Sequence, residues 1–222
     1  MPDLVIFDCD GVLVDSEGIF ARVLGQCLTE ADCPATAAEA LLLGFGKNRD
    51  TLTAAVETRY GRALPAGFFE AMRERTALVL ERELKPIPGV AELLSALPGA
   101  RCVASNGHLQ RVRERLALTG LLHFFDPHVF SAIEVAAGKP APDLFLLAAT
   151  RLGVEAADCV VVEDSVVGVT AAVAAGMPVV GFCGGSHCAD DHADRLTAAG
   201  CVRVFSNMTE LAAYLCGTQP CG

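Results

Sequence analysis

Short runs of consecutive apolar residues recur along this chain, and most are followed by a longer stretch with helical periodicity. The runs cover residues 4–7, 101–104, 128–130, 159–162, 178–182 and 202–205. Strands that are apolar throughout, rather than at every second residue, are typical of a sheet buried on both faces. The pattern therefore predicts an α/β fold with a doubly wound parallel sheet, and helices near residues 109–118, 143–152 and 166–175.

One long segment departs from this alternation. From about residue 16 to residue 83 the sequence has helical periodicity only, as in Ile19, Val23 and Leu24, and again around Leu78. A Pro-Ile-Pro-Gly stretch at 86–89 then precedes the return to the alternating pattern. We expect a core made of residues 1–15 and 85–222, with an inserted all-helical cap domain at residues 16–84.

Composition and charge narrow the class of partner. The chain has 222 residues, is 52% hydrophobic and carries a formal net charge of -10. Nucleic acids and anionic membranes are bound through Lys/Arg surfaces, so we expect neither as a partner. No apolar run approaches the length of a membrane span, and residues 4–7 are too few for a signal peptide. We therefore expect a cytoplasmic protein, as a monomer or a weak homodimer.

The ten cysteines contain no C-x-x-C pair. Cys183, His187 and Cys188 form the only local cluster, without the usual pair spacing of a zinc site. Disulfide frameworks belong to small secreted domains, which this chain does not resemble. We expect reduced thiols, several of them buried as small hydrophobic side chains.

Two aspartates follow the first apolar run, in the string Asp8-Cys9-Asp10-Gly11-Val12. Ligand sites in doubly wound sheets gather at the carboxyl ends of strands. Gly11 permits a turn after which Asp8 faces a phosphorus atom and Asp10 faces the leaving-group oxygen. A carboxylate nucleophile paired with a carboxylic acid is a chemically complete set for phosphoryl transfer.

Two further segments offer groups that suit a phosphate. Ser105, Asn106 and Gly107 follow the second apolar run, and they provide donors just ahead of a predicted helix. Lys139 stands between Gly138 and a proline, so its backbone is restricted and its ammonium group can be aimed. A cation there would stabilise charge on the phosphoryl group and on the nucleophile.

Glu163, Asp164 and Ser165 end the most apolar run. Carboxylates at this position are candidate ligands for Mg²⁺, which prefers oxygen. The ion would offset repulsion between a carboxylate nucleophile and a phosphate. We expect Asp164 to bind directly, Glu163 to bind directly or through water, and Ser165 to begin the next helix.

The four segments, in this order, resemble the haloacid dehalogenase-like superfamily over essentially the whole chain. The match is closest to its phosphatase and β-phosphoglucomutase branch with a helical cap. The resemblance implies a Rossmann-like core and a cap that closes over a small phosphorylated substrate. It implies that Asp8 is the nucleophile and Asp10 the general acid/base. It also implies that Asp8, the Asp10 carbonyl and Asp164 bind Mg²⁺ with Glu163, while Ser105, Asn106 and Lys139 hold the phosphoryl group.

Alternatives within this family can be weighed on residues. Dehalogenases generally lack the second aspartate, so Asp10 favours phosphate ester chemistry. β-Phosphoglucomutases typically carry a histidine early in the cap, and here Phe20 stands about where that histidine is expected. Hydrolysis is therefore favoured over mutase chemistry. The third alternative is a catalytically silent binding protein on the same fold.

The remaining candidates concern substrate choice and histidines. Lys47 and Arg49 lie in a glycine-flexed loop, where the family has its substrate-specificity loop, and they could clamp a carboxylate, hydroxyls or a second phosphate. We expect a sugar phosphate or a sugar-acid phosphate as substrate. For His108 and His187 we expect a surface or loop-anchoring role.

Overall fold

The computed structural model describes residues 1–44 and 49–217, and the chain divides into two compact units. One unit comprises Met1–Val14 together with Lys85–Gly222, and the other comprises Asp15–Leu84. The segment of unbroken helical periodicity in the sequence thus folds as a unit of its own.

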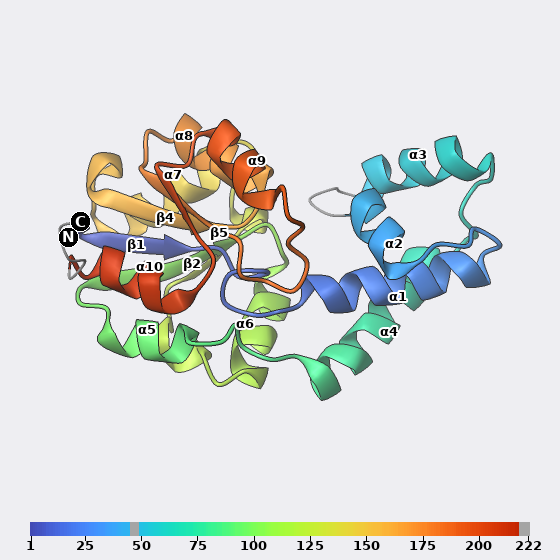
Figure 1. Ribbon diagram of the computed structural model, residues 1–222, viewed down its shortest axis with the longest axis horizontal. Coiled ribbons are helices and arrows are strands. Elements are labelled where there is room, and N and C mark those ends of the chain that lie inside the picture. The colour runs from blue at the N-terminus through green and yellow to red at the C-terminus, as the bar shows by residue number, and fades with distance from the viewer. Residues whose placement is uncertain (45–48, 218–222) are drawn as a thin grey trace. The chain divides into compact units, whose positions relative to one another are not determined.

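The first unit is built on a six-stranded sheet in the order β3-β2-β1-β4-β5-β6, and every neighbouring pair is parallel. Figure 1 shows β1 at its centre. The strands are β1 (Leu4–Phe7), β2 (Ala100–Ser105), β3 (Val129–Ser131), β4 (Cys159–Glu163), β5 (Val179–Phe182) and β6 (Arg203–Phe205). This order and direction confirm the doubly wound, Rossmann-like prediction. The strand order reverses between β1 and β4, so their carboxyl ends border the position where such sheets bind ligands.

Helices cover both faces of this sheet. They are α5 (Val90–Ala96), α6 (Leu109–Leu118), α7 (Asp143–Leu152), α8 (Val166–Ala174), α9 (His192–Ala199) and α10 (Met208–Leu215). In Figure 1, α7, α8 and α9 lie on one side and α5, α6 and α10 on the other. The helices predicted from the sequence are confirmed to within one residue. Ser165 caps α8, since its side chain accepts a hydrogen bond from the Gly168 amide.

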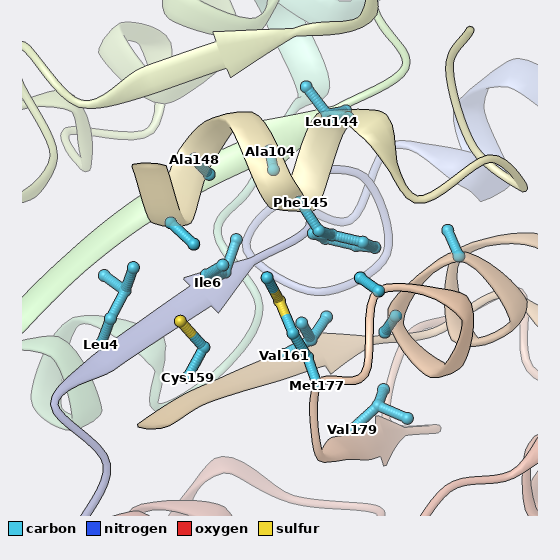
Figure 2. Close-up of a cluster of buried hydrophobic side chains, with 14 of the residues drawn as sticks. Leu4, Ile6, Ala104, Leu144, Phe145, Ala148, Cys159, Val161, Met177 and Val179 are labelled. Atoms are coloured by element: carbon cyan, nitrogen blue, oxygen red, sulfur yellow. The ribbon is translucent and has the colours of Figure 1, made fainter. Parts of the chain in front are cut away.

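The core beneath α7 fixes the central strand. Leu144, Phe145 and Ala148 of α7 belong to the same buried cluster as Leu4 and Ile6 of β1 (Figure 2). Burying each large apolar side chain contributes roughly 1.5–3 kcal/mol. Because β1 is apolar at every position, both of its faces take part in such packing. The residues that follow β1 are therefore held on a rigid support.

The second unit contains α1 (Glu17–Glu30), α2 (Ala37–Gly44), α3 (Arg49–Tyr60) and α4 (Phe68–Glu83), and no strand among its described residues. A buried cluster that includes Val23, Leu28, Val56 and Leu80 joins the helices. Leu78, one of the residues that indicated helical periodicity, lies in α4 as expected but is 56% exposed. The Leu78 side chain faces away from the cluster, because the helical period turns the side chain of Leu80 towards it.

Within the described ranges 1–44 and 49–217, no helix combines the length and the apolar character needed to cross a membrane. The nine cysteines in these ranges are free, and Cys9, Cys102 and Cys159 are buried in the sheet region as expected.

Candidate active site

A tight turn follows β1 and carries both aspartates of the first motif. The Asp8 amide donates to the Val162 carbonyl of β4 (3.0 Å), and the Gly11 amide donates to the Val14 carbonyl (2.9 Å). Gly11 has φ of +80°, in the left-handed region that favours glycine. A Cβ at this position would lie 1.8 Å from Oδ2 of Asp164. Glycine here thus allows the turn after β1 to approach the end of β4.

Lys139 joins two carboxylates from different strand ends. Its Nζ lies 2.5 Å from Oδ1 of Asp8 and 2.6 Å from Oε1 of Glu163. All three residues are buried, and the ammonium group also lies 4.8 Å from the centre of the Phe145 ring. Burial alone lowers the pKa of Lys139, but the charges of Asp8 and Glu163 outweigh it and hold the pKa above its usual 10.5. Lys139 is therefore a fixed cation and not a solvated surface lysine.

Glu163 uses both carboxylate oxygens on protein donors. Oε1 accepts from Lys139, while Oε2 accepts from the Asp164 amide (3.0 Å) and from the amide and hydroxyl of Ser165 (2.9 and 3.0 Å). A Cβ on Gly168 of α8 would lie 1.8 Å from Oε1, so glycine makes room for this carboxylate. The residue that ends β4 is held rigidly by its own loop and by Lys139.

The carboxylates outnumber the cations around Lys139. Desolvation by burial raises the pKa of Asp8 well above its usual 3.8; Lys139 opposes this rise, and the charges of Glu163, Asp164 and Asp10 add to it. Desolvation likewise raises the pKa of Asp164, with Glu163 as the next contribution. The cluster therefore favours an additional positive charge near Asp8 and Asp164.

The segment after β2 is tied to the Lys139 loop. The Asn106 side chain donates to the Lys139 carbonyl (3.0 Å) and accepts from the Lys139 amide (2.9 Å). The Gly107 amide donates to the buried Ser105 hydroxyl oxygen (3.1 Å), and its carbonyl accepts from Ser131 of β3 (2.6 Å). The structure thus brings this motif next to Lys139, and the Asn106 side chain positions the lysine backbone.

Asp10 has a partner that the sequence analysis missed. Arg115 of α6 forms an ion pair with the Asp10 carboxylate, and the two side chains are only 11% and 17% exposed. They are 105 positions apart, and Arg115 lies in an ordinary amphipathic helix with several arginines. No sequence signal separates it from its neighbours.

Two histidines contact Asp164, and the sequence analysis predicted neither contact. Nε2 of His187 lies 2.9 Å from Oδ2 of Asp164, and Nε2 of His192 lies 2.6 Å from the Asp164 carbonyl oxygen. Both histidines are buried, so the surface role expected of His187 is wrong. It does anchor its loop, because the chain after β5 returns to the carboxyl edge of the sheet. His108 is exposed, as expected.

The two candidate substrate-binding residues of the helical unit, Lys47 and Arg49, have different outcomes. Lys47 lies outside the described residues. Arg49 is the first residue of α3, with its guanidinium 3.6 Å from Glu70 and stacked 4.5 Å from the Phe69 ring centre. Its side chain is 61% exposed, so a substrate-binding role for Arg49 stays a prediction.

Comparison with known proteins gives the family of the chain. Residues 2–176 match the family described as haloacid dehalogenase-like hydrolases. The chain belongs to this family.

Three proteins illustrate what this chain is similar to. The 6-phosphogluconate phosphatase of Escherichia coli K12 is 32% identical over 83% of this chain and 84% of its own length. The fructose-1-phosphate phosphatase of the same organism is 34% identical over 79% and 94%. A haloacid dehalogenase-like protein of unknown function from Agrobacterium tumefaciens superposes with a TM-score of 0.90 at 43% identity, covering 98% and 99% of the two chains. The enzyme class that fits the chain is phosphoric monoester hydrolase.

Proposed function

We propose that this protein is a magnesium-dependent phosphatase that forms an aspartyl-phosphate, an acyl phosphate, on the carboxylate of Asp8. The observation that carries this proposal is the placement of Lys139 between Asp8 and Glu163, beside Asp164, where β1 and β4 end. A buried carboxylate held by a fixed cation can approach a phosphorus atom without water competing for it.

The residues present fit a magnesium ion. Asp8, Asp164 and the Asp10 carbonyl offer oxygen only, which is the ligand type of Mg²⁺. Mutual repulsion and burial raise the pKa of both Asp8 and Asp164, and a divalent cation relieves both effects. Gly11 leaves open the space beside Oδ2 of Asp164 that a Cβ would fill. Glu163 already accepts four protein hydrogen bonds, so we propose that its contribution to the metal is through water. When bound, the ion supplies charge neutralisation and orientation of the phosphate.

The protein's own residues account for both chemical steps, the transfer of the phosphoryl group to Asp8 and its release to water. The Asp8 carboxylate attacks phosphorus, the bond from phosphorus to the leaving oxygen breaks, and Asp10 gives that oxygen a proton. Asp10, now a carboxylate, takes a proton from water as the water attacks the phosphorus of the acyl phosphate, which returns the Asp8 carboxylate and releases phosphate. Lys139 and the groups of Ser105, Asn106 and Gly107 stabilise the phosphoryl oxygens.

We propose a sugar phosphate or a sugar-acid phosphate as the substrate. Both curated relatives described above are named for phosphates of this kind. Aromatic residues make up 6% of the chain and tryptophan is absent from the sequence, which gives little basis for a platform that stacks nucleobases. Lys47 and Arg49 of the helical unit are the residues we propose for recognising the substrate beyond its phosphate.

Phosphate release from a panel of sugar phosphates, sugar-acid phosphates and nucleotides, with Mg²⁺ and with chelator, tests the activity. Release should depend on the metal and favour a few related compounds. Asp8→Asn should lower it by more than about 1,000-fold, as expected when a nucleophile is lost. The exposed Asp158→Asn is the matched control. Full activity in Asp8→Asn would refute the nucleophile. Conversion of a hexose phosphate into its isomer, with a bisphosphate added and no release, would show a mutase.

Metal binding can be measured without a substrate. Mg²⁺ should raise the melting temperature of the wild type, by an amount equivalent to about 2.7 kcal/mol at a concentration 100 times its dissociation constant. Asp164→Asn should lose this shift, and Asp158→Asn should keep it. An undiminished shift in Asp164→Asn would remove Asp164 from the metal site.

A further inference from the structure

The loop between β5 and α9 brings three metal-binding side chains together beside Asp164. His187 and Cys188 lie in the loop, and His192 is the first residue of α9. One ligand atom from each lies within 4.8 Å of the other two. The two histidines are buried and Cys188 is half-buried. In the sequence, His187 and Cys188 are a pair of neighbours without a third ligand. The folded chain adds His192 to them.

The distance between two of the ligand atoms suits a tetrahedral ion. Zinc bonds to sulfur at about 2.3 Å and to imidazole nitrogen at about 2.0–2.1 Å, which places the two ligand atoms about 3.5 Å apart. Sγ of Cys188 lies 3.5 Å from Nε2 of His187. The two imidazole rings stand edge to face, with 5.5 Å between centres, so that they do not stack against each other.

His192 already has the hydrogen bond that commonly fixes a metal-binding histidine. Its Nε2 contacts the Asp164 carbonyl at 2.6 Å, and a carbonyl only accepts, so Nε2 carries the hydrogen. The neutral ring then has its lone pair on Nδ1. Ligating histidines usually donate their other ring nitrogen to a carbonyl or carboxylate in this way.

The His187 ring is held in place by two glycines. A Cβ on Gly185 would lie 2.7 Å from Cε1 and Nδ1 of the ring, and a Cβ on Gly11 would lie 2.9 Å from Cε1. Real side chains do not approach so closely, so the ring fits only because both positions lack one. A ligand fixed in this manner loses little freedom when it binds an ion.

We propose that His187, Cys188 and His192 form a binding site for a borderline-soft divalent cation of the zinc type. Thiolate and imidazole select such ions, whereas the all-oxygen set of Asp8 and Asp164 selects magnesium. Binding replaces the hydrogen on Nε2 of His187 and the hydrogen on Sγ of Cys188, and both leave as protons to solvent. Oδ2 of Asp164 lies 2.9 Å from Nε2 of His187, so the site borders the carboxylate of Asp164.

One consequence follows for the neighbouring magnesium site, and it rests on the proposed function. An ion bound to Nε2 of His187 places positive charge next to the Asp164 carboxylate that we assign to magnesium, and two neighbouring cations repel each other. Zinc at saturation is therefore expected to reduce the Mg²⁺-dependent rise in melting temperature. The binding test below uses neither magnesium nor a phosphate ester, so its failure is distinct from failure of the phosphatase assignment.

Cobalt(II) titration of the metal-free full-length protein tests the site directly, since a tetrahedral cobalt thiolate gives a charge-transfer band in the near ultraviolet. We expect the band to saturate at one ion per chain and to disappear when zinc is added. Cys188→Ser should lose the band and bind zinc more than about 100-fold more weakly, because even outer partners of a metal are worth 10–100-fold. Cys183→Ser, which changes another half-buried thiol of the same loop, is the matched control.

Melting curves of both variants without metal check that each is folded. No thiolate band in the wild type, or an unchanged band in Cys188→Ser, would overturn the proposal. Loss of the band in Cys183→Ser together with its retention in Cys188→Ser would also overturn it. An unaltered zinc affinity in Cys188→Ser would reduce the cluster to an anchor that fastens its loop to Asp164.

Discussion

Arg115, on α6, forms an ion pair with Asp10, which follows β1. The pair is mostly shielded from water, and hydrogen bonds between charged groups are the stronger kind. The guanidinium therefore fixes the direction of the carboxylate that we propose as the general acid and base. A helix on one face of the sheet in this way supports a group at the edge of the sheet.

Arg115→Leu should lower turnover of a sugar phosphate by about 10–100-fold, because a general acid contributes roughly 100-fold or more only when it is aimed. Hydrolysis of p-nitrophenyl phosphate should fall less, since its leaving group needs little protonation. Arg113→Leu is the control, because Arg113 lies on the same helix and pairs with Asp126 at the surface. Equal losses on both substrates would contradict a role acting through Asp10.

Lys139→Met should both inactivate and destabilise the protein. The substitution leaves Asp8 and Glu163 buried without their shared cation, which typically costs about 3–5 kcal/mol. Urea unfolding and phosphate release measure the two effects. Arg151→Met, an exposed change on α7, should alter neither by much. A stable and active Lys139→Met protein would show that the ion pairs do not organise the site.

Gly168→Ala tests how closely Glu163 is packed. The added methyl group would lie 1.8 Å from Oε1 of Glu163, so this carboxylate must move away from Lys139. We expect a loss of about 1–3 kcal/mol in the free energy of unfolding. A shift of about 1 Å in Glu163 and Lys139, close to the reacting groups, should reduce turnover by about 100-fold. Thr170→Ala, an exposed change on the same helix, should leave turnover unchanged. Wild-type turnover in Gly168→Ala would show that Glu163 can shift freely.

The metal-free protein should become less stable as the pH rises from about 4. Burial raises the folded-state pKa of Asp8 and Asp164 above 3.8, so the folded chain binds more protons than the unfolded chain in this window. Their stabilising contribution is complete below 3.8 and is lost as the pH passes the raised folded values. Saturating Mg²⁺ should stabilise the protein increasingly over the same range, since it binds the ionised carboxylates.

Urea unfolding across this pH range, for the wild type and for Asp164→Asn, measures the effect. The comparison is needed because burial lowers the pKa of His192, which acts in the opposite direction. Asp164→Asn should show the shallower decline. An equal decline in the two proteins would mean that Asp164 is ionised at little cost.

The sequence alone was enough to predict the parallel sheet and the order of its strands and helices along the chain. The runs at 4–7 and 159–162 are apolar at every position, a pattern that is typical of strands buried on both faces. The four-segment site was also predictable, since strand ends in a parallel sheet meet at one edge. Leu78 shows the limit of periodicity, because it is exposed although the buried Leu80 is only two positions away.

Pairings between distant side chains were decided by the tertiary structure. Arg115 resembles the other arginines of its helix, and only the packing of α6 brings it to Asp10. The sequence gives no reason to place His187 and His192 at Asp164, and both reach it only because the chain after β5 turns back towards the end of β4. The physical reason is the distance along the sequence between the residues that interact. Burial patterns and turn residues are properties of neighbouring positions, whereas ion pairs and metal ligands depend on side chains that meet only after the sheet and its helices have packed.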